Sequence, residues 1–352
     1  MKALVLYGAG DLRFEDRPLP VCGPTDVRVR VAWCGVCGSD MPRIFKTGAH
    51  RHPIVPGHEF SGVAADVGAE VSRVQVGDRV VVFPLLWCGR CGACEIGQYA
   101  QCADYDYLGS RSDGGFAEYV SAPEANIRPI PDALSLDVAA LAEPTAVALH
   151  ALRRSPIGPT GRVVVVFGAG PIGILAAQWA RLMGARHVLV FDPIGARREA
   201  AVRCGLECAF DPAAEPARSV TARYSDGQGA AICIDAAGVP ATLIEACETV
   251  ARSGVVVMLG NPSADVTLPR STLSRLLRTE ATLVGVWNSC YSVHSSDDDW
   301  SVALGALADG SLQAEALISD RVPIADGLAR LTEMAEGRSV GMKTLIGDGA
   351  ES

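Results

Sequence analysis

From about residue 161, short apolar runs alternate with stretches of helical length. The apolar runs are rich in β-branched residues and predict buried strands at 163–167, 187–191, 231–235, 255–259 and 281–286. The stretches between them predict helices, for example Pro240–Ala251. Strands that alternate with helices in this way indicate a doubly wound parallel sheet, so we predict an α/β fold for this half.

The first 150 residues show a different pattern. Short runs such as Met1–Tyr7 and Asp26–Ala32 predict strands separated by turns rich in proline and glycine. Leu136–Leu152 has the character of a helical passage. After residue 288 the chain has a further helix at Trp300–Ala308 and a strand-like piece at Lys343–Ile346. We expect this tail to return to the first, mainly β domain.

A glycine motif, Gly168–Gly173, follows the predicted strand 163–167 with the spacing G-x-G-x-x-G. Its first glycine permits a tight turn, the second lets the backbone approach a pyrophosphate, and the third lets the next helix, Ile174–Leu182, pack closely. Asp192 ends the second strand, where a carboxylate suits a ribose 2′-OH and disfavours a 2′-phosphate. The motif predicts a dinucleotide site that prefers NAD to NADP; the alternative is an ordinary turn in a flavodoxin-like domain.

The cofactor contacts are expected from this motif and from the ends of the strands. The predicted cofactor-binding residues are Gly168, Gly170, Pro171, Ile172, Gly173, Asp192, Arg197, Gly260 and Val286. For Arg197, a place beside the adenine and a solvated position on a helix face are equally compatible with the sequence.

Composition narrows the class of protein. The length of 352 residues and the hydrophobic content of 49% suit two domains. A net charge of −9 without a basic run argues against a nucleic-acid partner. No apolar run reaches about 18 residues and no secretory signal opens the chain, so we expect no membrane span and a cytoplasmic location. The twelve cysteines then indicate metal ligands or buried thiols rather than disulfides.

Four cysteines lie close together in a glycine-rich loop: Cys88, Cys91, Cys94 and Cys102. Thiolates bind zinc tetrahedrally, and a four-cysteine site is closed and structural. Metal binding would supply folding free energy that such a loop lacks. A zinc ribbon that binds nucleic acid would need separated cysteine pairs and a basic surface; four unligated cysteines are the other alternative.

A second metal site is less determined by spacing. Cys37 offers a thiolate, His58 an imidazole, and Glu59 or Glu143 a carboxylate. A catalytic zinc has three protein ligands and one open position. Asp40 is placed to hydrogen-bond a ligand histidine. Spacing alone does not decide whether these residues bind a metal. Cys37 could equally be a buried thiol and His58 an ordinary loop histidine.

Taken together, these motifs resemble the zinc-dependent medium-chain alcohol/polyol dehydrogenases over essentially the whole chain. The matching segments are Cys37–Asp40, Gly57–Glu59, the cysteine lobe 88–102, Glu143-Pro144 and Gly168–Gly173. The resemblance implies a GroES-like catalytic domain at 1–150 and 289–352, interrupted by a Rossmann NAD-binding domain at 151–288. It implies two zinc ions per chain: a structural one on the lobe, and a catalytic one on Cys37, His58 and Glu143 or Glu59. Ser39 would begin a proton relay.

Segments 37–50, 57–62 and 101–119 look most like the branch of this family that oxidises galactitol 1-phosphate. Arg43 and Lys46 would then serve a phosphate or a hydroxyl-rich substrate, or remain solvated loop cations. One segment departs from the family pattern and carries the acidic run Asp297–Asp299. Such a run is most often a solvated turn or a helix N-cap. An acidic run near the cleft would be unfavourable beside a phosphate.

We therefore predict an enzyme that transfers a hydride to NAD from a secondary alcohol of a polyol, polyol phosphate or cyclitol. One alternative is an aminocyclitol or amino-sugar dehydrogenase of a biosynthetic pathway. A zinc-free reductase of the same superfamily would lack the cysteine lobe, and a non-enzymatic NAD-binding protein would be favoured only by loss of Cys37 or His58. The family also suggests a homodimer or homotetramer that pairs through an edge strand of the Rossmann sheet.

Overall fold

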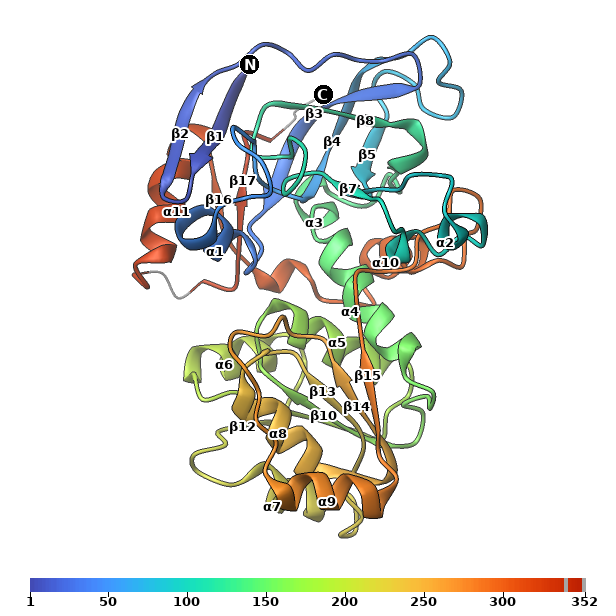
Figure 1. Cartoon of the computed structure of the whole chain (residues 1–352), viewed down its shortest axis with the longest axis vertical. Helices are drawn as coiled ribbons and strands as arrows, with labels where there is room; N and C mark the ends of the chain where they lie inside the picture. The colour runs from blue at the N-terminus through green and yellow to red at the C-terminus, as the bar shows by residue number, and fades with distance from the viewer. Residues whose placement is uncertain (339–340, 350–352) are drawn as a thin grey trace. The chain divides into compact units, whose positions relative to one another are not determined.

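The computed structural model describes residues 1–338 and 341–349, and the chain divides into two compact units (Figure 1). Unit 1 comprises Met1–Glu143, Cys290–Asp309 and Ile318–Ser352, and unit 2 comprises Pro144–Ser289 and Gly310–Leu317. The first change of unit falls seven residues before the predicted boundary at 150, because helix α4 (Ala142–Arg154) runs across both positions. Residues 310–317, predicted for the first domain, belong to unit 2. Residues 339–340 and 350–352 of the predicted first domain lie outside the described residues.

Unit 2 contains a six-stranded parallel sheet. Its strands are β10 (Val163–Phe167), β11 (His187–Phe191), β12 (Ala209–Phe210), β13 (Ala230–Asp235), β14 (Val250–Met258) and β15 (Thr282–Gly285). The strand order is β12-β11-β10-β13-β14-β15, which is the order of a dinucleotide-binding doubly wound fold. Every residue of β10 is buried, as expected for a central strand covered on both faces. The predicted α/β fold is confirmed.

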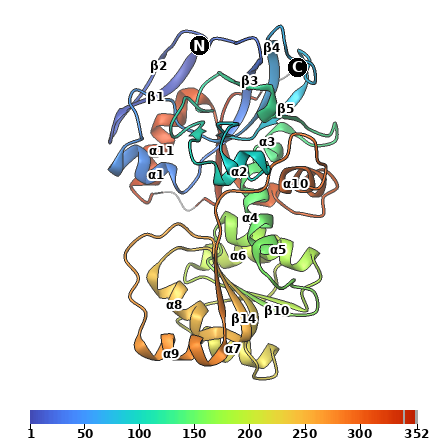
Figure 2. The ribbon, with the colours of Figure 1, turned by 45° about the vertical axis from the view of Figure 1, so that its right-hand side comes forward.

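Helices connect these strands. The connecting helices are α5 (Pro171–Leu182), α6 (Gly195–Arg203), α7 (Ala217–Tyr224), α8 (Pro240–Thr249) and α9 (Arg270–Thr279). Helix α4 precedes the first strand, and the short η4 (Glu315–Leu317) follows the last one. Figure 2 shows α7, α8 and α9 together beside the sheet. Helix α5 starts three residues earlier than predicted, because Pro171 has the backbone angle that suits a first helical residue. Its N-terminus therefore lies inside the glycine motif.

Unit 1 is built around a seven-stranded sheet and two small hairpins. The large sheet runs β16 (Ile318–Val322), β17 (Lys343–Ile346), β3 (Asp26–Gly35), β4 (Glu59–Val67), β5 (Arg79–Val82) and β9 (Ile127–Pro129), and β8 (Tyr119–Pro123) also pairs with β3. The small pairs are β1 (Lys2–Gly8) with β2 (Asp11–Asp16), and β6 (Leu85–Leu86) with β7 (Asp106–Tyr107). The C-terminal tail thus returns to the first unit as expected.

The remaining elements of unit 1 are short helices. They are α1 (Asp40–Pro42), η1 (Arg43–Thr47), α2 (Gly92–Glu95), η2 (Tyr99–Gln101), η3 (Glu124–Asn126), α3 (Leu136–Ala139), α10 (Asp299–Ala308), η5 (Ile324–Asp326) and α11 (Gly327–Ala335). The predicted helical passage 136–152 is therefore two helices, α3 and α4. Among the described residues, no helix combines the length and the apolar character that crossing a membrane requires.

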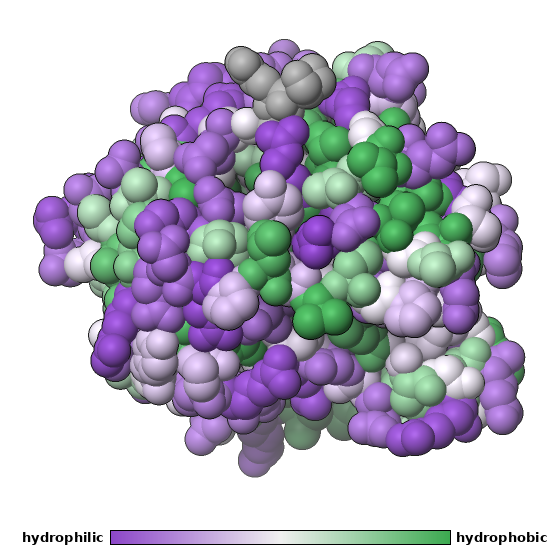
Figure 3. All heavy atoms as spheres, turned by 90° about the horizontal axis from the view of Figure 1, so that it is seen from above, coloured by the Kyte–Doolittle hydropathy of each residue, from purple (hydrophilic) through white to green (hydrophobic). Residues whose placement is uncertain are grey.

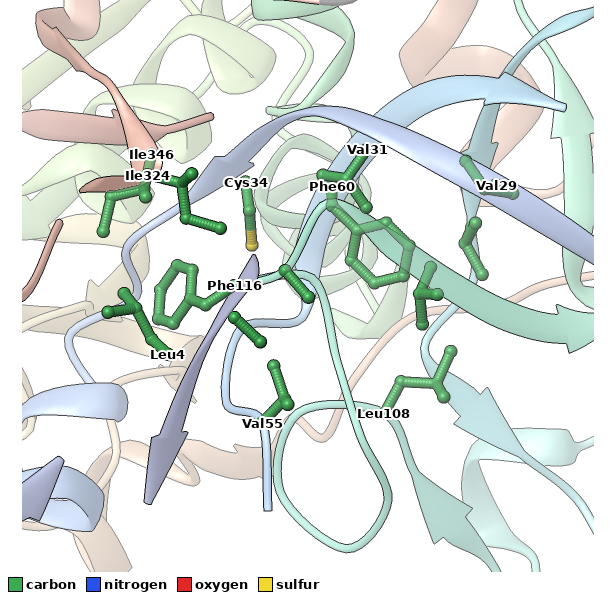
Figure 4. Packing of buried hydrophobic residues seen from close by; sticks show 14 of the residues in the cluster. Leu4, Val29, Val31, Cys34, Val55, Phe60, Leu108, Phe116, Ile324 and Ile346 are labelled. Carbon is green, nitrogen blue, oxygen red and sulfur yellow. The ribbon is translucent and has the colours of Figure 1, made fainter. Parts of the chain in front are cut away.

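Both ends of the chain contribute to one hydrophobic core in unit 1. Figure 4 shows Leu4 of β1, Ile324 of η5 and Ile346 of β17 around the buried Phe116 and Cys34. The tail strand is therefore part of the core that supports the candidate site.

Hydrophilic residues cover most of the face in Figure 3, with hydrophobic ones between them, as is usual for a surface that contacts water.

In the acidic run Asp297–Asp299 the helix N-cap alternative is confirmed, because Asp298 is the N-cap of α10, whereas a surface of exposed acids is not formed by Asp298 and Asp299. Asp298 pairs with Arg128 at 2.8 Å and accepts hydrogen bonds from the backbone N–H groups of Ser292 and Ser301, both at 2.7 Å. Asp299 accepts from the N–H of Cys290 at 2.6 Å. Both carboxylates are buried, at 2% and 0% exposure. The expectation of repulsion toward a phosphate is therefore wrong for these two residues, because their charges are used to order the segment before α10.

Arg128 is the cation that faces buried Asp298, and replacing it with Met leaves that carboxylate unpaired. We expect Arg128→Met to lower the free energy of unfolding by about 3 kcal/mol, since breaking a buried ion pair is strongly destabilising. Denaturation by urea followed by tryptophan fluorescence measures the change. Arg13→Met is the matched control, because its pair with Asp11 is exposed to solvent and should contribute little to stability. Equal losses in the two variants would contradict this interpretation.

Candidate active site

Cys37, His58 and Glu59 come together at one end of the large sheet in unit 1. Cys37 follows β3, and Glu59 opens β4 directly opposite Gly35 in the strand register. One ligand atom from each of the three lies within 4.8 Å of the others. His58 and Glu59 are only 5% and 1% exposed. A thiolate, an imidazole and a carboxylate grouped in a buried position fit a zinc ion that keeps one open position.

Asp40 contacts both Cys37 and His58 and so helps to orient them. One of its oxygens accepts a hydrogen bond from the N–H of Cys37 at 2.9 Å, and the other pairs with Arg43 at 2.6 Å. The second oxygen also faces Nδ1 of His58 at 3.6 Å, which turns the ring so that its other nitrogen is free for a metal. This is the supporting position expected for Asp40. Arg43 is engaged here, so the structure does not support its suggested role toward a substrate phosphate.

The electrostatics of the group favour a cation. Burial lowers the pKa of His58, but the negative charges of Asp40 and Cys37 outweigh burial and raise it well above its usual value. Burial and the nearby charge of Glu59, opposed by the positive charges of His58 and Lys343, raise the pKa of Glu143 to about 7. Several acids therefore share one poorly hydrated space, and a divalent cation would relieve their repulsion.

Glu143 lies at the edge of this group, in the first turn of α4. It is not among the three residues whose ligand atoms lie within 4.8 Å. Its Oε1 accepts a hydrogen bond from the hydroxyl of Tyr107 at 3.4 Å, and the Tyr107 ring meets His58 edge-on with centroids 5.8 Å apart. Sequence reasoning did not single out Tyr107, although it lies in the segment 101–119 that carries the family resemblance.

Glu59 has a partner that sequence reasoning missed. Nζ of Lys343 donates to Oε2 of Glu59 at 2.6 Å and to the carbonyl of Val36 at 3.0 Å, and both charged side chains are buried. Burial lowers the pKa of Lys343, but Glu59 and Cys37 outweigh it and raise the pKa. The available signal was a lysine at the start of an apolar strand, in a chain with only three lysines.

Ser39 lies two residues beyond Cys37, immediately before α1. It is partly exposed, and its side chain makes no capping hydrogen bond to that helix. Its hydroxyl is therefore not committed to the helix end, which is compatible with the expected start of a proton relay.

The four cysteines of the lobe converge around α2. The Sγ atom of Cys91 lies 3.5 Å from Sγ of Cys94 and 3.9 Å from Sγ of Cys102. The Sγ atoms of Cys88 and Cys94 are 4.0 Å apart. Tetrahedral zinc–thiolate bonds would separate the sulfurs by about 3.8 Å. The observed spacing therefore fits a zinc ion with four thiolate ligands.

The thiols of the lobe differ in pKa, and therefore in how readily each one ionises to bind a metal. Hydrogen bonds from backbone N–H groups, chiefly that of Ala103, lower the pKa of Cys91 to about 6. Burial and then the neighbouring Cys91 raise the pKa of Cys94 to about 12. Four thiolates this close repel one another, so their joint ionisation requires a cation among them.

The glycine motif in unit 2 has the geometry expected for a dinucleotide. Gly168 has a φ of +101°, and a Cβ on Gly173 would collide with the carbonyl oxygen of Gly168. Gly170 is the N-cap of α5, and a Cβ there would meet nothing within 4 Å. The turn thus leaves open space in front of the free N–H groups of α5, which begins with Pro171, Ile172 and Gly173.

Asp192 lies at the end of β11 and contacts the motif directly. It is 2% exposed and accepts hydrogen bonds from the N–H groups of Ala169 and Ile194, both at 2.8 Å. Arg197 approaches the same carboxylate at 3.6 Å. Gly260 and Val286 follow β14 and β15 at the same, carboxyl edge of the sheet. The predicted cofactor residues therefore gather at the edge where such sheets bind ligands.

Two family models match the chain. The alcohol dehydrogenase GroES-like domain matches residues 23–132, and the zinc-binding dehydrogenase domain matches residues 171–308. These matches agree with the mainly β first unit and the parallel sheet of the second.

Two curated relatives and one solved structure are similar to this chain over nearly their full length. Galactitol 1-phosphate 5-dehydrogenase of Escherichia coli K12 is 35% identical over 98% of this chain and 100% of its own. A crystal structure of galactitol-1-phosphate dehydrogenase from E. coli superposes with a TM-score of 0.91 at 34% identity, covering 99% of this chain and 100% of that one. Probable D-xylulose reductase A of Emericella nidulans is 32% identical over 99% of this chain and 97% of its own.

A putative zinc-binding dehydrogenase from Sinorhizobium meliloti, solved bound to NADP, has a TM-score of 0.89 at 28% identity. It covers 98% of each chain. The resemblance drawn from the sequence is thus confirmed. The chain belongs to the zinc-binding medium-chain alcohol dehydrogenase family, and it is an oxidoreductase that works with zinc and a nicotinamide dinucleotide.

Proposed function

We propose that this enzyme oxidises a secondary alcohol of a polyol or polyol phosphate with NAD. The observation that carries the proposal is the buried group of Cys37, His58 and Glu59, within 4.8 Å of one another. It is supported by relatives whose names specify galactitol 1-phosphate and D-xylulose. The name of neither relative specifies an aminocyclitol, and no observation favours the alternative of an aminocyclitol or amino-sugar dehydrogenase.

The residues of unit 1 have separate roles in this proposal. Cys37 and His58, with Glu59 or Glu143, would hold the zinc ion, and Asp40 would keep His58 in orientation. Bound zinc would act as a Lewis acid that lowers the pKa of an alcohol. The Ser39 hydroxyl would pass the released proton outward. The low exposure of His58 and Glu59 would limit the access of water to the reacting group.

The residues of unit 2 would hold the cofactor. The open space at Gly170 and the free N–H groups of α5 would receive the pyrophosphate. Asp192 would accept a hydrogen bond from a ribose hydroxyl and repel a 2′-phosphate, so NAD is expected to be preferred although one relative was solved with NADP. Arg197, paired with Asp192, is exposed enough to lie beside the adenine.

The structure offers cations for a phosphorylated substrate other than Arg43. Arg51 and Arg111 line a hollow of about 360 Å³ with His50 and Tyr105. Asp104 and Asp106 line it too, so its charge is mixed. If the substrate reaches this hollow, the two arginines of the hollow would bind a phosphate and its two acids would oppose one. The comparison of phosphorylated with free polyols is therefore the deciding experiment.

That experiment measures cofactor reduction with galactitol 1-phosphate, free hexitols, inositols and an aminocyclitol, each with NAD and with NADP. We expect a polyol or polyol phosphate to give the highest kcat/KM, and NAD to exceed NADP by at least about tenfold because of the charge of Asp192. A preference for the aminocyclitol would contradict the substrate class. A preference for NADP would contradict the role of Asp192 without affecting the substrate assignment.

Metal analysis tests the two proposed zinc sites. We expect about two zinc ions per chain. Cys37→Ser should remove one and lower kcat/KM by on the order of 10³-fold, with NAD affinity retained. Cys91→Ser should remove the other and speed proteolysis within the loop 88–102, because the loop loses its cross-link. Cys22→Ser is the control, since that thiol belongs to neither candidate metal group and donates to the carbonyl of Asp26 in unit 1. Full zinc content in Cys37→Ser would refute the ligand assignment.

We also propose a homodimer or homotetramer. Strand β15 is an edge of the sheet in unit 2, and its Leu283 is 38% exposed. On α9, Leu273 and Leu277 are 50% and 73% exposed. An unpaired edge strand can pair with the same strand of a second copy across a two-fold axis, which would also cover exposed apolar side chains.

Leu277→Glu places a charge on this apolar surface, and we expect it to weaken self-association at least about tenfold. Sedimentation equilibrium over a range of protein concentrations measures the effect. Val21→Glu, at an 85% exposed position of unit 1, is the control and should leave association unchanged. A wild-type protein that is monomeric at all concentrations would exclude the proposal.

A cytoplasmic location is proposed because all twelve cysteines are free, as expected in a reducing compartment. Fractionation of the source cells would test it.

The net charge of −9 does not support a nucleic-acid partner.

A further inference from the structure

The ion pair between Lys343 and Glu59 depends on three strands that are far apart in sequence. Leu345 of β17 pairs with Gly35 of β3, and Gly35 pairs with Glu59 of β4. Lys343, two residues before Leu345, therefore points from the tail strand toward the first residue of β4. A Cβ at Gly35 would lie 2.5 Å from Oε2 of Glu59, so the absence of a side chain there gives the carboxylate its space.

The acids around the site are held by different kinds of partner. Asp40 pairs with the cation of Arg43, and Glu59 with the cation of Lys343, each at 2.6 Å. Glu143 instead accepts a hydrogen bond from the neutral hydroxyl of Tyr107, at a longer 3.4 Å, and among the described residues it has no ion pair within 4 Å. The two candidate carboxylate ligands therefore differ: one oxygen of Glu59 is strongly held, whereas Glu143 is held weakly.

A carboxylate can bind a metal through one oxygen or through both. When Lys343 holds Oε2, Glu59 has only its other oxygen to offer. A catalytic zinc needs a position that no protein atom fills, so a second Glu59 oxygen would compete with the alcohol. The two hydrogen bonds of Nζ, to Glu59 and to the Val36 carbonyl, hold the ammonium where it prevents this.

We propose that Lys343 is a positioning residue of the active site, which restricts Glu59 to one metal-binding oxygen and so keeps a coordination position open for the substrate alcohol. The inference rests on the proposed zinc ligands Cys37, His58 and Glu59 or Glu143. It assigns a catalytic consequence to the C-terminal strand, whose residues do not themselves bind the metal.

The test uses the full-length protein with cobalt(II) in place of zinc, because the intensity of cobalt absorption in the visible range falls as coordination number rises. In Lys343→Met, Glu59 regains its second oxygen, so we expect a weaker cobalt band. With zinc, the same variant should show kcat/KM lowered about 10- to 100-fold, the usual effect of losing a partner that orients a metal ligand. Lys343→Arg keeps a cation and should restore most of the band.

A double variant separates positioning from simple stability. Lys343→Met leaves a buried carboxylate unpaired and is expected to be destabilising by itself. Lys343→Met combined with Glu59→Gln removes both charges, and the amide cannot bind metal through two oxygens, so the four-coordinate band should return. Lys2→Met makes the same chemical change at an exposed pair with Asp16 and should leave the spectrum unchanged. If Lys343→Met lowers only the melting temperature and leaves the cobalt band and the KM for the alcohol unchanged, the proposal is overturned.

The same spectra distinguish failure of this inference from failure of the proposed ligands. Cys37→Ser should abolish the catalytic cobalt band and leave the contribution of the four-cysteine lobe. If that variant keeps the full wild-type spectrum, the ligand assignment is wrong. If it loses the band but Lys343→Met does not alter it, only the role of Lys343 is wrong.

Discussion

Buried negative charge is the constraint on which unit 1 depends. Glu59 and Glu143 are buried, Cys37 lies with Glu59 in the group within 4.8 Å, and Asp40 contacts both Cys37 and His58. Isolated charges are costly to bury, so each must be neutralised by a partner or a metal. The fold supplies Arg43 and Lys343 as fixed cations. The remaining negative charge favours a divalent cation at this position, as the proposed zinc site requires.

This constraint also explains why the chain returns to its first unit after forming the second. Strand β17 completes the large sheet next to β3, and its Ile346 joins the core that contains Leu4 and Phe116 (Figure 4). The same strand carries Lys343 to Glu59. Core packing and charge neutralisation at the site therefore depend on one short segment near the C-terminus.

The acidic run before α10 shows how the same physical rule acts outside the site. Asp298 and Asp299 looked like surface charges in the sequence, but both are buried and bonded to Arg128 or to backbone N–H groups. A local sequence pattern cannot show this, because Arg128 lies on β9, about 170 residues earlier. Asp298 and Asp299, which depart from the family pattern, thus order a loop and do not form an exposed acidic surface that would repel a substrate.

The sequence alone determined the features that depend on neighbouring residues. The strands 163–167 and 187–191, the glycine turn and the grouping of four cysteines at 88–102 follow from local spacing and from side-chain chemistry. The candidate ligands Cys37, His58 and Glu59 or Glu143 were favoured only by the resemblance to the family. Tertiary structure decided the rest: the pairing of Lys343 with Glu59, the contact of Tyr107 with Glu143, the engagement of Arg43 by Asp40, and the unit boundary inside α4. These features arise where strand register brings distant residues into one buried space, and there the partner of a charge is chosen by proximity in the fold rather than by position along the chain.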